Sequence, residues 1–429
     1  MNELSFLLIG LWLGAHILIA AQRLFFSRIG LLLLFGLFML MGVYLIKPLT
    51  YDLQKYSIYF STGYIPTHAW HTTLEWKNIP VTPEGYFSLD DRDMTGEPFD
   101  SAFEPGFDWL SKLTHGILPS GSLLKRVDQQ HRDFVSRGPP RADAAILFIG
   151  VLGLALVSVA MATMHRQVFQ RSFKQHDVLL FVCVLLGSVY FLLGSQNALR
   201  QFLGSLFVLN AVAALLNRRY LIAIVLCLGA GLFHRWAPIL GAIALGLSFL
   251  VNFQRDSMGL RQIQPFSFSR LEVCVLLIAV GFALAVKLVA VTGLFNMDVP
   301  LLDDLKSYLI KGAQHDAAER LGALKKILIL IGLVAITEFV MGQTQNEEFN
   351  RLRALRRKIF IFLVPFGFYS EIFSRLLVLF WLADFMMTYF CLRSESIRLR
   401  VAGSFIFLAY GLAPNAINIL LGPDWFYAR

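Results

Sequence analysis

The chain has 429 residues, of which 56% are hydrophobic and only 16% are charged, and its formal net charge is +9. Soluble domains contain about 25% charged residues, so this composition excludes an ordinary soluble protein and predicts a membrane protein. The basic residues lie in short loops between apolar runs. That distribution reports membrane topology and does not indicate nucleic-acid binding.

Two apolar runs open the chain, the first from Leu4 to Ala21 and the second ending near Lys47. The first has no basic segment before it and no A-x-A cleavage site after it, so we expect a retained helix and not a signal peptide. The longest polar stretch follows over 48–143, with 13 Asp and Glu against 9 Lys and Arg. A stretch of this length and composition is expected to fold as an extracytoplasmic loop subdomain.

Ten further apolar runs follow, and a bilayer core takes about 20 helical residues to cross. They cover residues 144–164, 177–193, 199–216, 220–233, 237–252, 271–293, 323–341, 359–373, 375–391 and 401–419. Since a lipid-exposed backbone must satisfy its own hydrogen bonds, the runs predict an all-α polytopic bundle. We expect a single transmembrane domain over 1–429 with about twelve helices, one large outer loop between helices 2 and 3, and a second outer loop at 294–322.

The loops that contain basic residues alternate along the chain. Six of them contain 18 Lys or Arg in total, and they are 22–28, 165–176, 217–219, 253–270, 342–358 and 392–400. The positive-inside rule places these six loops in the cytoplasm and both termini outside.

This topology brings several basic groups to the outer face, where Arg200 and Arg375 occupy short turns and His234 and Arg235 lie together. Guanidinium groups bind phosphate in a bidentate geometry. Snorkelling to lipid headgroups is the alternative for any single arginine. Several on one side, with a histidine, favour an outward anion site, and the anion available there is a lipid-linked phosphate or diphosphate.

Three sequence segments resemble the EpsG family of exopolysaccharide and O-antigen polymerases, which are Wzy-like membrane proteins. Asn197-Ala-Leu-Arg200-Gln201, followed by a basic turn and Leu232-Phe233-His234, resembles the family's G-x-R-Q element, helical hairpin and F-H-x-S-A element. Phe103-Glu104-Pro105-Gly106-Phe107 resembles its E-P-G-[FY] segment. Looser matches are Arg375 near the start of a late helix and Tyr427 in the tail.

The chain departs from this family pattern at two positions. Ala198 and Trp236 stand where the family has Gly and Ser, and Arg235 adds a charge. Trp236 puts in doubt any role for a hydroxyl at that point.

The resemblance implies a GT-C-like glycosyltransferase in the bacterial cytoplasmic membrane, with its active site facing outward. Such a polymerase transfers a glycan from undecaprenyl diphosphate to the end sugar of a second lipid-linked repeat unit. Donor and acceptor lipids are then its partners in the membrane, and a chain-length regulator protein is a further candidate partner. No cofactor, metal ion or nucleic acid is expected.

The residues that match the family have expected roles. Arg200, Arg375 and Arg235 would bind the diphosphate and stabilise it as it leaves, in place of a metal ion. Either His234 or Glu104 would take the proton of the acceptor hydroxyl, and the choice stays open; Glu104 followed by Pro would also suit a helix start. Supporting contacts to substrate are expected from Gln201, Asn197, Glu371 and Tyr427.

Two other functional classes stay open on the sequence. An O-antigen ligase, or a glycosyltransferase that uses a polyprenyl monophosphate sugar, would share the outward arginines and differ in acceptor. A lipid-linked oligosaccharide flippase would show repeat-related halves and charged residues at midplane depth. The chain shows no convincing internal repeat, which favours an enzyme.

Asp91 and Asp93 form an Asp-x-Asp pattern, but their acidic surroundings favour a solvated surface over a metal site.

Overall fold

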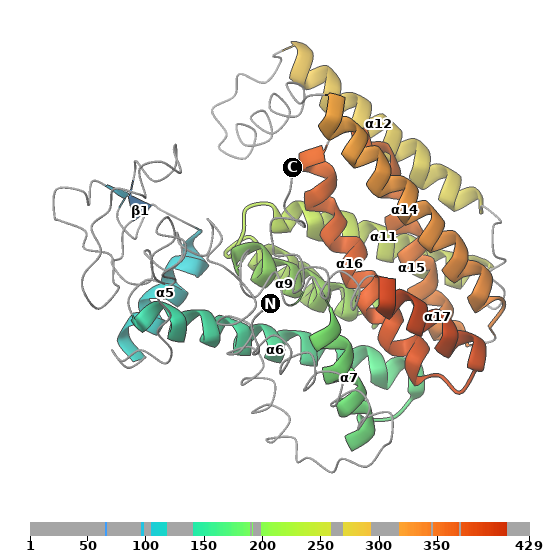
Figure 1. Ribbon diagram of the computed structural model, residues 1–429, viewed down its shortest axis with the longest axis horizontal. Coiled ribbons are helices and arrows are strands. Elements are labelled where there is room, and N and C mark those ends of the chain that lie inside the picture. Colours follow the sequence, from blue (N-terminus) through green and yellow to red (C-terminus); the bar gives the residue numbers. More distant parts are fainter. Residues whose placement is uncertain are drawn as a thin grey trace, which may run out of the picture.

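The computed structural model describes residues 65–66, 96–97, 104–117, 140–188, 191, 199–258, 269–292, 317–344, 346–368 and 370–409 (Figure 1). Within these ranges β1 (Ile65–Pro66) pairs antiparallel with β2 (Gly96–Glu97), and the other elements are helices. The predicted helical bundle is confirmed for this part of the chain.

The described helices follow one another along the chain. They are α5 (Pro105–Ile117), α6 (Pro140–Phe169), α7 (Gln175–Gly187), α9 (Leu199–Leu216), α10 (Tyr220–Ala230), α11 (Ala237–Met258), α12 (Arg270–Thr292), α14 (Ala317–Met341), α15 (Glu347–Leu363), the 3-10 helix η4 (Val364–Phe368), α16 (Ser370–Arg393) and α17 (Ile397–Phe407). Among them, 4 have the length and composition to cross a membrane, namely α6, α9, α11 and α16. The expected total of about twelve spans also depends on residues 1–47, which lie outside the described ranges, and the GT-C-like arrangement stays a prediction.

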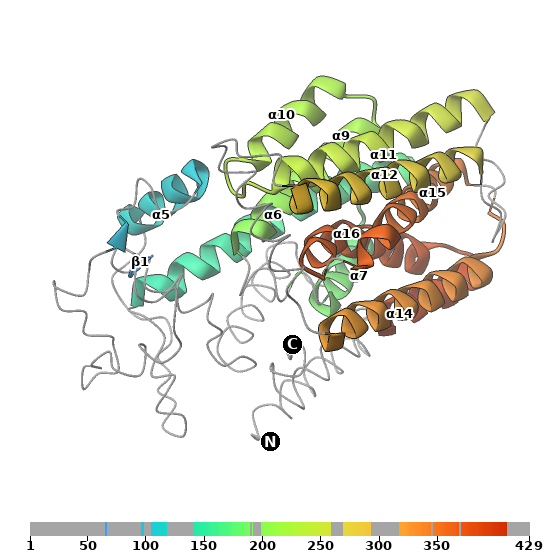
Figure 2. The same ribbon diagram turned by 90° about the horizontal axis from the view of Figure 1, so that it is seen from above.

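Helix α9 forms the centre of the bundle and has nearly all of its residues buried. It packs against α6, α10 and α11, and Figure 2 shows α9, α10 and α11 lying close together. Residues 217–219 alone connect α9 to α10, so the two helices run antiparallel. Gly204 permits this close packing, because a Cβ there would lie 2.8 Å from Ala237 Cβ and 3.2 Å from His234 Cβ. The N-terminal end of α9 therefore lies beside the turn that follows α10.

Helix α15 corrects the prediction that 342–358 is a cytoplasmic loop. Only 342–346 connects α14 to α15, and the helix begins at Glu347, where the side chain of Asn346 accepts a hydrogen bond from the Phe349 N–H. The five basic residues of this segment are buried, and they are Arg351, Arg353, Arg356, Arg357 and Lys358. The loop prediction was wrong because it treated basic side chains as exposed. The apolar run expected at 359–373 begins within this helix, which itself starts twelve residues earlier, at Glu347.

Acidic and polar side chains of neighbouring helices surround the buried basic residues of α15. The pairs are Arg353 with Glu338, Arg356 with Asp384, Arg357 with Glu272, and Lys358 with Gln254. Loss of one partner from a buried ion pair costs about 3–5 kcal/mol, because the remaining charge stays uncompensated. These pairs link α15 to α14, α16, α12 and α11.

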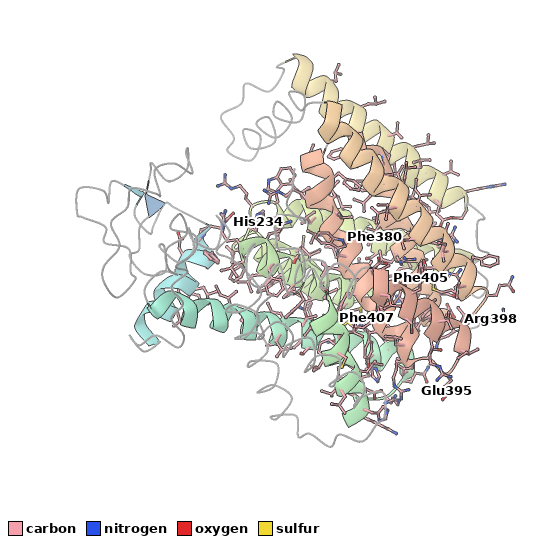
Figure 3. All side chains as sticks on the ribbon, in the orientation of Figure 1. His234, Phe380, Glu395, Arg398, Phe405 and Phe407 are labelled. Carbon is pink, nitrogen blue, oxygen red and sulfur yellow. The ribbon has the colours of Figure 1, made fainter. Side chains whose placement is uncertain are left out.

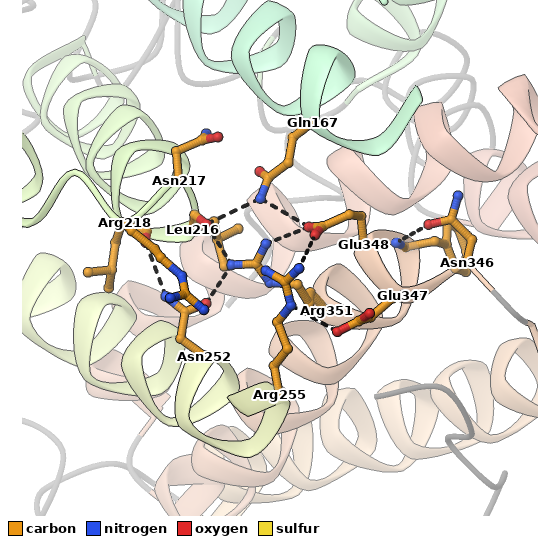
Figure 4. Close-up of polar contacts among 12 residues, drawn as sticks. Gln167, Leu216, Asn217, Arg218, Asn252, Arg255, Asn346, Glu347, Glu348 and Arg351 are labelled. Atoms are coloured by element: carbon orange, nitrogen blue, oxygen red, sulfur yellow. Dashed lines mark hydrogen bonds and ion pairs between the residues drawn. The ribbon is translucent and has the colours of Figure 1, made fainter. Parts of the chain in front are cut away.

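A polar network holds the C-terminal end of α9 (Figure 4). One guanidinium nitrogen of Arg351, Nη2, donates to the Leu216 carbonyl and to Asn252 Oδ1, both at 2.5 Å. Gln167 Nε2 also donates to the Leu216 carbonyl at 3.2 Å and to Glu348 Oε2 at 3.0 Å. The last carbonyl of α9 thus gains two side-chain donors that the helix itself does not supply. This network lies at one end of α9, and the family motif lies at the other, about 25 Å away at 1.5 Å per residue.

Candidate functional site

Three segments meet at the N-terminal end of α9: the first turn of α9, the turn 231–236, and the start of α5. Figure 3 labels His234 at the side of the bundle that faces α5. The Gly106 N–H donates to the Leu232 carbonyl at 2.8 Å. A Cβ at Gly106 would lie 2.7 Å from that oxygen and 2.8 Å from Leu232 Cβ, so only glycine allows this approach. Pro105 occupies the first helical position of α5, where its missing N–H costs no hydrogen bond.

The start of α5 places the Glu104 carboxylate between two arginines. Its Oε2 accepts from Arg200 Nη1 at 2.8 Å, and its Oε1 accepts from the Arg235 backbone N–H at 3.0 Å. The Arg235 guanidinium lies 3.8 Å from Oε1. Burial by itself raises the pKa of Glu104, but the Arg200 charge and the Arg235 N–H outweigh it and hold the pKa below its ordinary value. Glu104 is therefore a carboxylate at neutral pH.

His234 lies in the same place and is 6% exposed. Its Nδ1 accepts a hydrogen bond from the Trp236 backbone N–H at 3.1 Å. Burial, followed by the charge of Arg200, lowers the pKa of His234 to about 3, although Glu104 acts in the opposite direction. The ring is therefore neutral near pH 7, and because Nδ1 accepts, its single proton is on Nε2.

A third arginine reaches the site from α16. Arg375 Nη1 donates to Gln201 Oε1 at 3.1 Å. The charges of Arg200, Arg375 and Arg235 all lower the pKa of His234, so the three guanidinium groups lie around one imidazole. Of the described side chains, these three arginines and one glutamate together carry a formal charge of +2. The side chain of Arg235 is 46% exposed and that of Arg200 is 19% exposed, so part of the positive charge reaches the surface of the protein.

The structure thus brings together six of the residues singled out from the sequence: Glu104, Arg200, Gln201, His234, Arg235 and Arg375. Glu371 lies in the first turn of α16, and its side chain falls outside the described residues. Asn197, Tyr427, Asp91 and Asp93 also lie outside the described residues.

Two contributions to the site were not recognised from the sequence. Trp236 contacts His234 through its backbone N–H, a group that every residue except proline supplies, so this contact does not depend on the serine of the family pattern. Gly106 and Gly204 allow the close approach of the three segments. Glycine weakens a helix, so a glycine inside a helix indicates a position where another segment packs closely. Gly106 in the second position of α5 and Gly204 inside the apolar helix α9 were the sequence signals for this close approach.

The chain matches a known protein family. A model of the EpsG family matches residues 143–423, which is most of the chain and includes Arg200, His234 and Arg375. Glu104 precedes the matched segment. No curated protein and no solved structure matches the chain. With its long apolar helices and this match, the chain is a membrane protein that belongs to the EpsG family.

Proposed function

We propose that the protein polymerises lipid-linked oligosaccharide repeat units into an exopolysaccharide or O-antigen. It would transfer the glycan of an undecaprenyl-diphosphate donor to the end sugar of a second lipid-linked unit, on the outer face of the cytoplasmic membrane. The observation that carries the proposal is the convergence of three arginines on Glu104 and His234 at one end of an apolar helix bundle. Membership of the EpsG family supports an exopolysaccharide polymerase-type function.

The charge of the site suits a diphosphate. Its formal charge of +2 is opposite in sign to a lipid-linked diphosphate, whose two phosphates are both anionic. Negative charge grows on the leaving phosphate oxygen as the glycosidic bond breaks, and preorganised cationic donors stabilise such charge most effectively. Gln201 holds Arg375 in place before substrate arrives, and Arg200 starts out paired with Glu104. In this proposal the guanidinium groups stabilise the leaving group.

The transfer step assigns one role to each remaining group. The acceptor hydroxyl oxygen forms a bond to the donor's anomeric carbon, the bond from that carbon to the phosphate oxygen breaks, and the electron pair leaves with the diphosphate. The acceptor's proton goes to Glu104, which is ionised. His234 fits a donor role better than a base role, because Nδ1 is occupied by the Trp236 N–H and Nε2 carries the proton. Its Nε2–H would stabilise a phosphate oxygen.

The direct test is polymerisation by the purified protein. A defined undecaprenyl-diphosphate oligosaccharide, incubated with the protein in lipid nanodiscs, should give a ladder of longer lipid-linked glycans and release undecaprenyl diphosphate. The same ladder is expected with a chelator present. Arg200→Ala, His234→Ala and Arg375→Ala should each abolish the ladder while the protein stays folded in the membrane.

The same assay separates the competing functions. A ligase would join the glycan to a non-repeat acceptor, and a flippase would give no new covalent product. No elongation by folded protein with both lipid substrates present contradicts the proposed function. Loss of the ladder on chelation alone overturns the role given to the arginines.

A further inference from the structure

The Arg200 guanidinium has two prospective partners. In the structure its Nη1 is 2.8 Å from Glu104 Oε2, and the side chains are 19% and 7% exposed. The proposed function gives the same guanidinium to the donor diphosphate and the same carboxylate to the acceptor's proton. While the pair is intact, Nη1 of Arg200 and Oε2 of Glu104 are engaged by each other and not by substrate.

We propose that the Glu104–Arg200 ion pair is a latch that the donor diphosphate displaces, so that the base becomes active only after the donor has bound. Arg200 turns from Glu104 Oε2 to the diphosphate, and Oε2 becomes available to the acceptor hydroxyl. This inference rests on the proposed function and adds to it an order of binding, donor first and acceptor second.

Electrostatics gives the reason for a latch. A carboxylate that pairs with arginine and accepts a backbone N–H has a lowered pKa, and for Glu104 both contacts outweigh the effect of burial. Such a group is a weak base, whereas an efficient general base has a pKa nearer the working pH. A diphosphate in the site removes Arg200 from the carboxylate and adds negative charge beside it. Both changes raise the pKa of Glu104 at the moment when a base is needed.

The geometry allows one oxygen to be released while the other stays held. Glu104 Oε1 accepts from the Arg235 backbone N–H at 3.0 Å, in the turn that Gly106 contacts through the Leu232 carbonyl. These contacts do not involve the Arg200 side chain. Departure of Arg200 therefore leaves the carboxylate in place with Oε2 exposed to substrate. Arg200 lies in the first turn of α9, where its side chain is 19% exposed.

The test measures binding of farnesyl diphosphate, a short prenyl diphosphate, to the purified full-length protein by calorimetry at pH 7. Glu104→Gln removes the competing charge, so this variant should bind the probe about tenfold more tightly than the wild type while making no polymer. Arg200→Ala should bind it about tenfold or more weakly. A more tightly binding but inactive variant shows that the Glu104 charge competes with the diphosphate, and the charge-conserving variant Glu104→Asp separates the Arg200 contact from the charge alone.

A second variant covers the case in which Glu104→Gln does not fold. Glu104→Asp keeps the charge but shortens the side chain by one methylene, so it cannot hold the 2.8 Å contact. It should bind the probe more tightly than the wild type and retain some polymerisation.

Unchanged or weaker binding in the folded Glu104 variants overturns the latch. Polymerisation by the wild type would still stand in that case, so the proposed function would survive. If the wild-type protein does not bind farnesyl diphosphate, the latch is overturned, and the polymerisation assay decides the proposed function separately.

Discussion

The backbone N–H of Trp236 donates a hydrogen bond to Nδ1 of His234 over 3.1 Å. This contact fixes the tautomer of a buried imidazole, and it leaves Nε2–H as the hydrogen-bond donor of the ring. Burial and the surrounding arginines keep the ring neutral. His234, predicted as a base or an orienting group, is therefore better suited to donate a hydrogen bond through Nε2–H.

Substitution of His234 by glutamine or asparagine tests the donor role. The amide N–H of glutamine reaches nearer the position of Nε2, and that of asparagine nearer the position of Nδ1. We expect His234→Gln to retain part of the polymerisation rate, and His234→Asn to lose about 10²–10³-fold, the typical cost of removing one stabilising donor. Initial rates from purified protein with a defined lipid substrate give the comparison. Equal and complete loss in both variants would favour a base.

The pH dependence gives an independent check on His234. Its pKa is lowered to about 3, so the ring does not change its charge between pH 5.5 and 8, and deprotonation as the pH rises is complete well below that range. The wild-type polymerisation rate should show no limb with a pKa near 6.5 (about the unperturbed value) that comes from this residue. A limb there that disappears in His234→Gln would contradict the neutral state.

Replacement of Gly106 tests the contact between α5 and the turn 231–236. In Gly106→Ala the new Cβ would lie 2.7 Å from the Leu232 carbonyl oxygen, so the start of α5 must move and carry Glu104 away from Arg200. We expect polymerisation to fall about tenfold or more, since small displacements of catalytic groups are costly. Gly246→Ala is the matched control, because a Cβ there meets nothing within 4 Å. A similar loss in both variants would show a general helix effect.

Gln201 is expected to position Arg375. Gln201→Ala removes the acceptor at 3.1 Å and leaves the charge of the site unchanged, so the donor KM should rise several-fold with a smaller change in kcat. Gln201→Glu keeps an acceptor but lowers the formal charge of the site by one unit, and it should weaken binding of a prenyl diphosphate further. Steady-state kinetics at varied donor concentration separate the two effects. An unchanged donor KM in Gln201→Ala would remove this role.

The buried pair of Arg356 and Asp384 predicts a large effect on stability. Asp384→Asn removes the charged partner at 2.5 Å and leaves the buried Arg356 guanidinium with Glu338 at 3.5 Å, so we expect a loss toward the lower end of about 3–5 kcal/mol. Thermal unfolding in detergent measures it. Asp256→Asn is the control, because its pair with Arg218 is more than half exposed and such pairs contribute about 0–1 kcal/mol. Equal stability of the two variants would contradict the importance of burial.

Much of the helical pattern could be predicted from the sequence, because hydropathy is a local property. The apolar run at 199–216 coincides with α9, Leu199–Leu216. The prediction failed at 342–358, where five basic residues indicated a loop and the structure has α15. A basic side chain is buried or exposed according to its partners, and Glu338 and Asp384 belong to other helices. Nothing within the segment itself identifies them.

The candidate site, like the fold, could be predicted from the sequence only in part. The sequence by itself determined the membrane class, the family resemblance and the residue types that suit a diphosphate, because composition and motif spacing carry that information. Only the tertiary structure decided that Glu104, 96 positions before Arg200, forms its ion pair, that Arg375 meets Gln201, and that His234 is neutral. These relations depend on distances between segments far apart in the chain and on the burial that their packing creates.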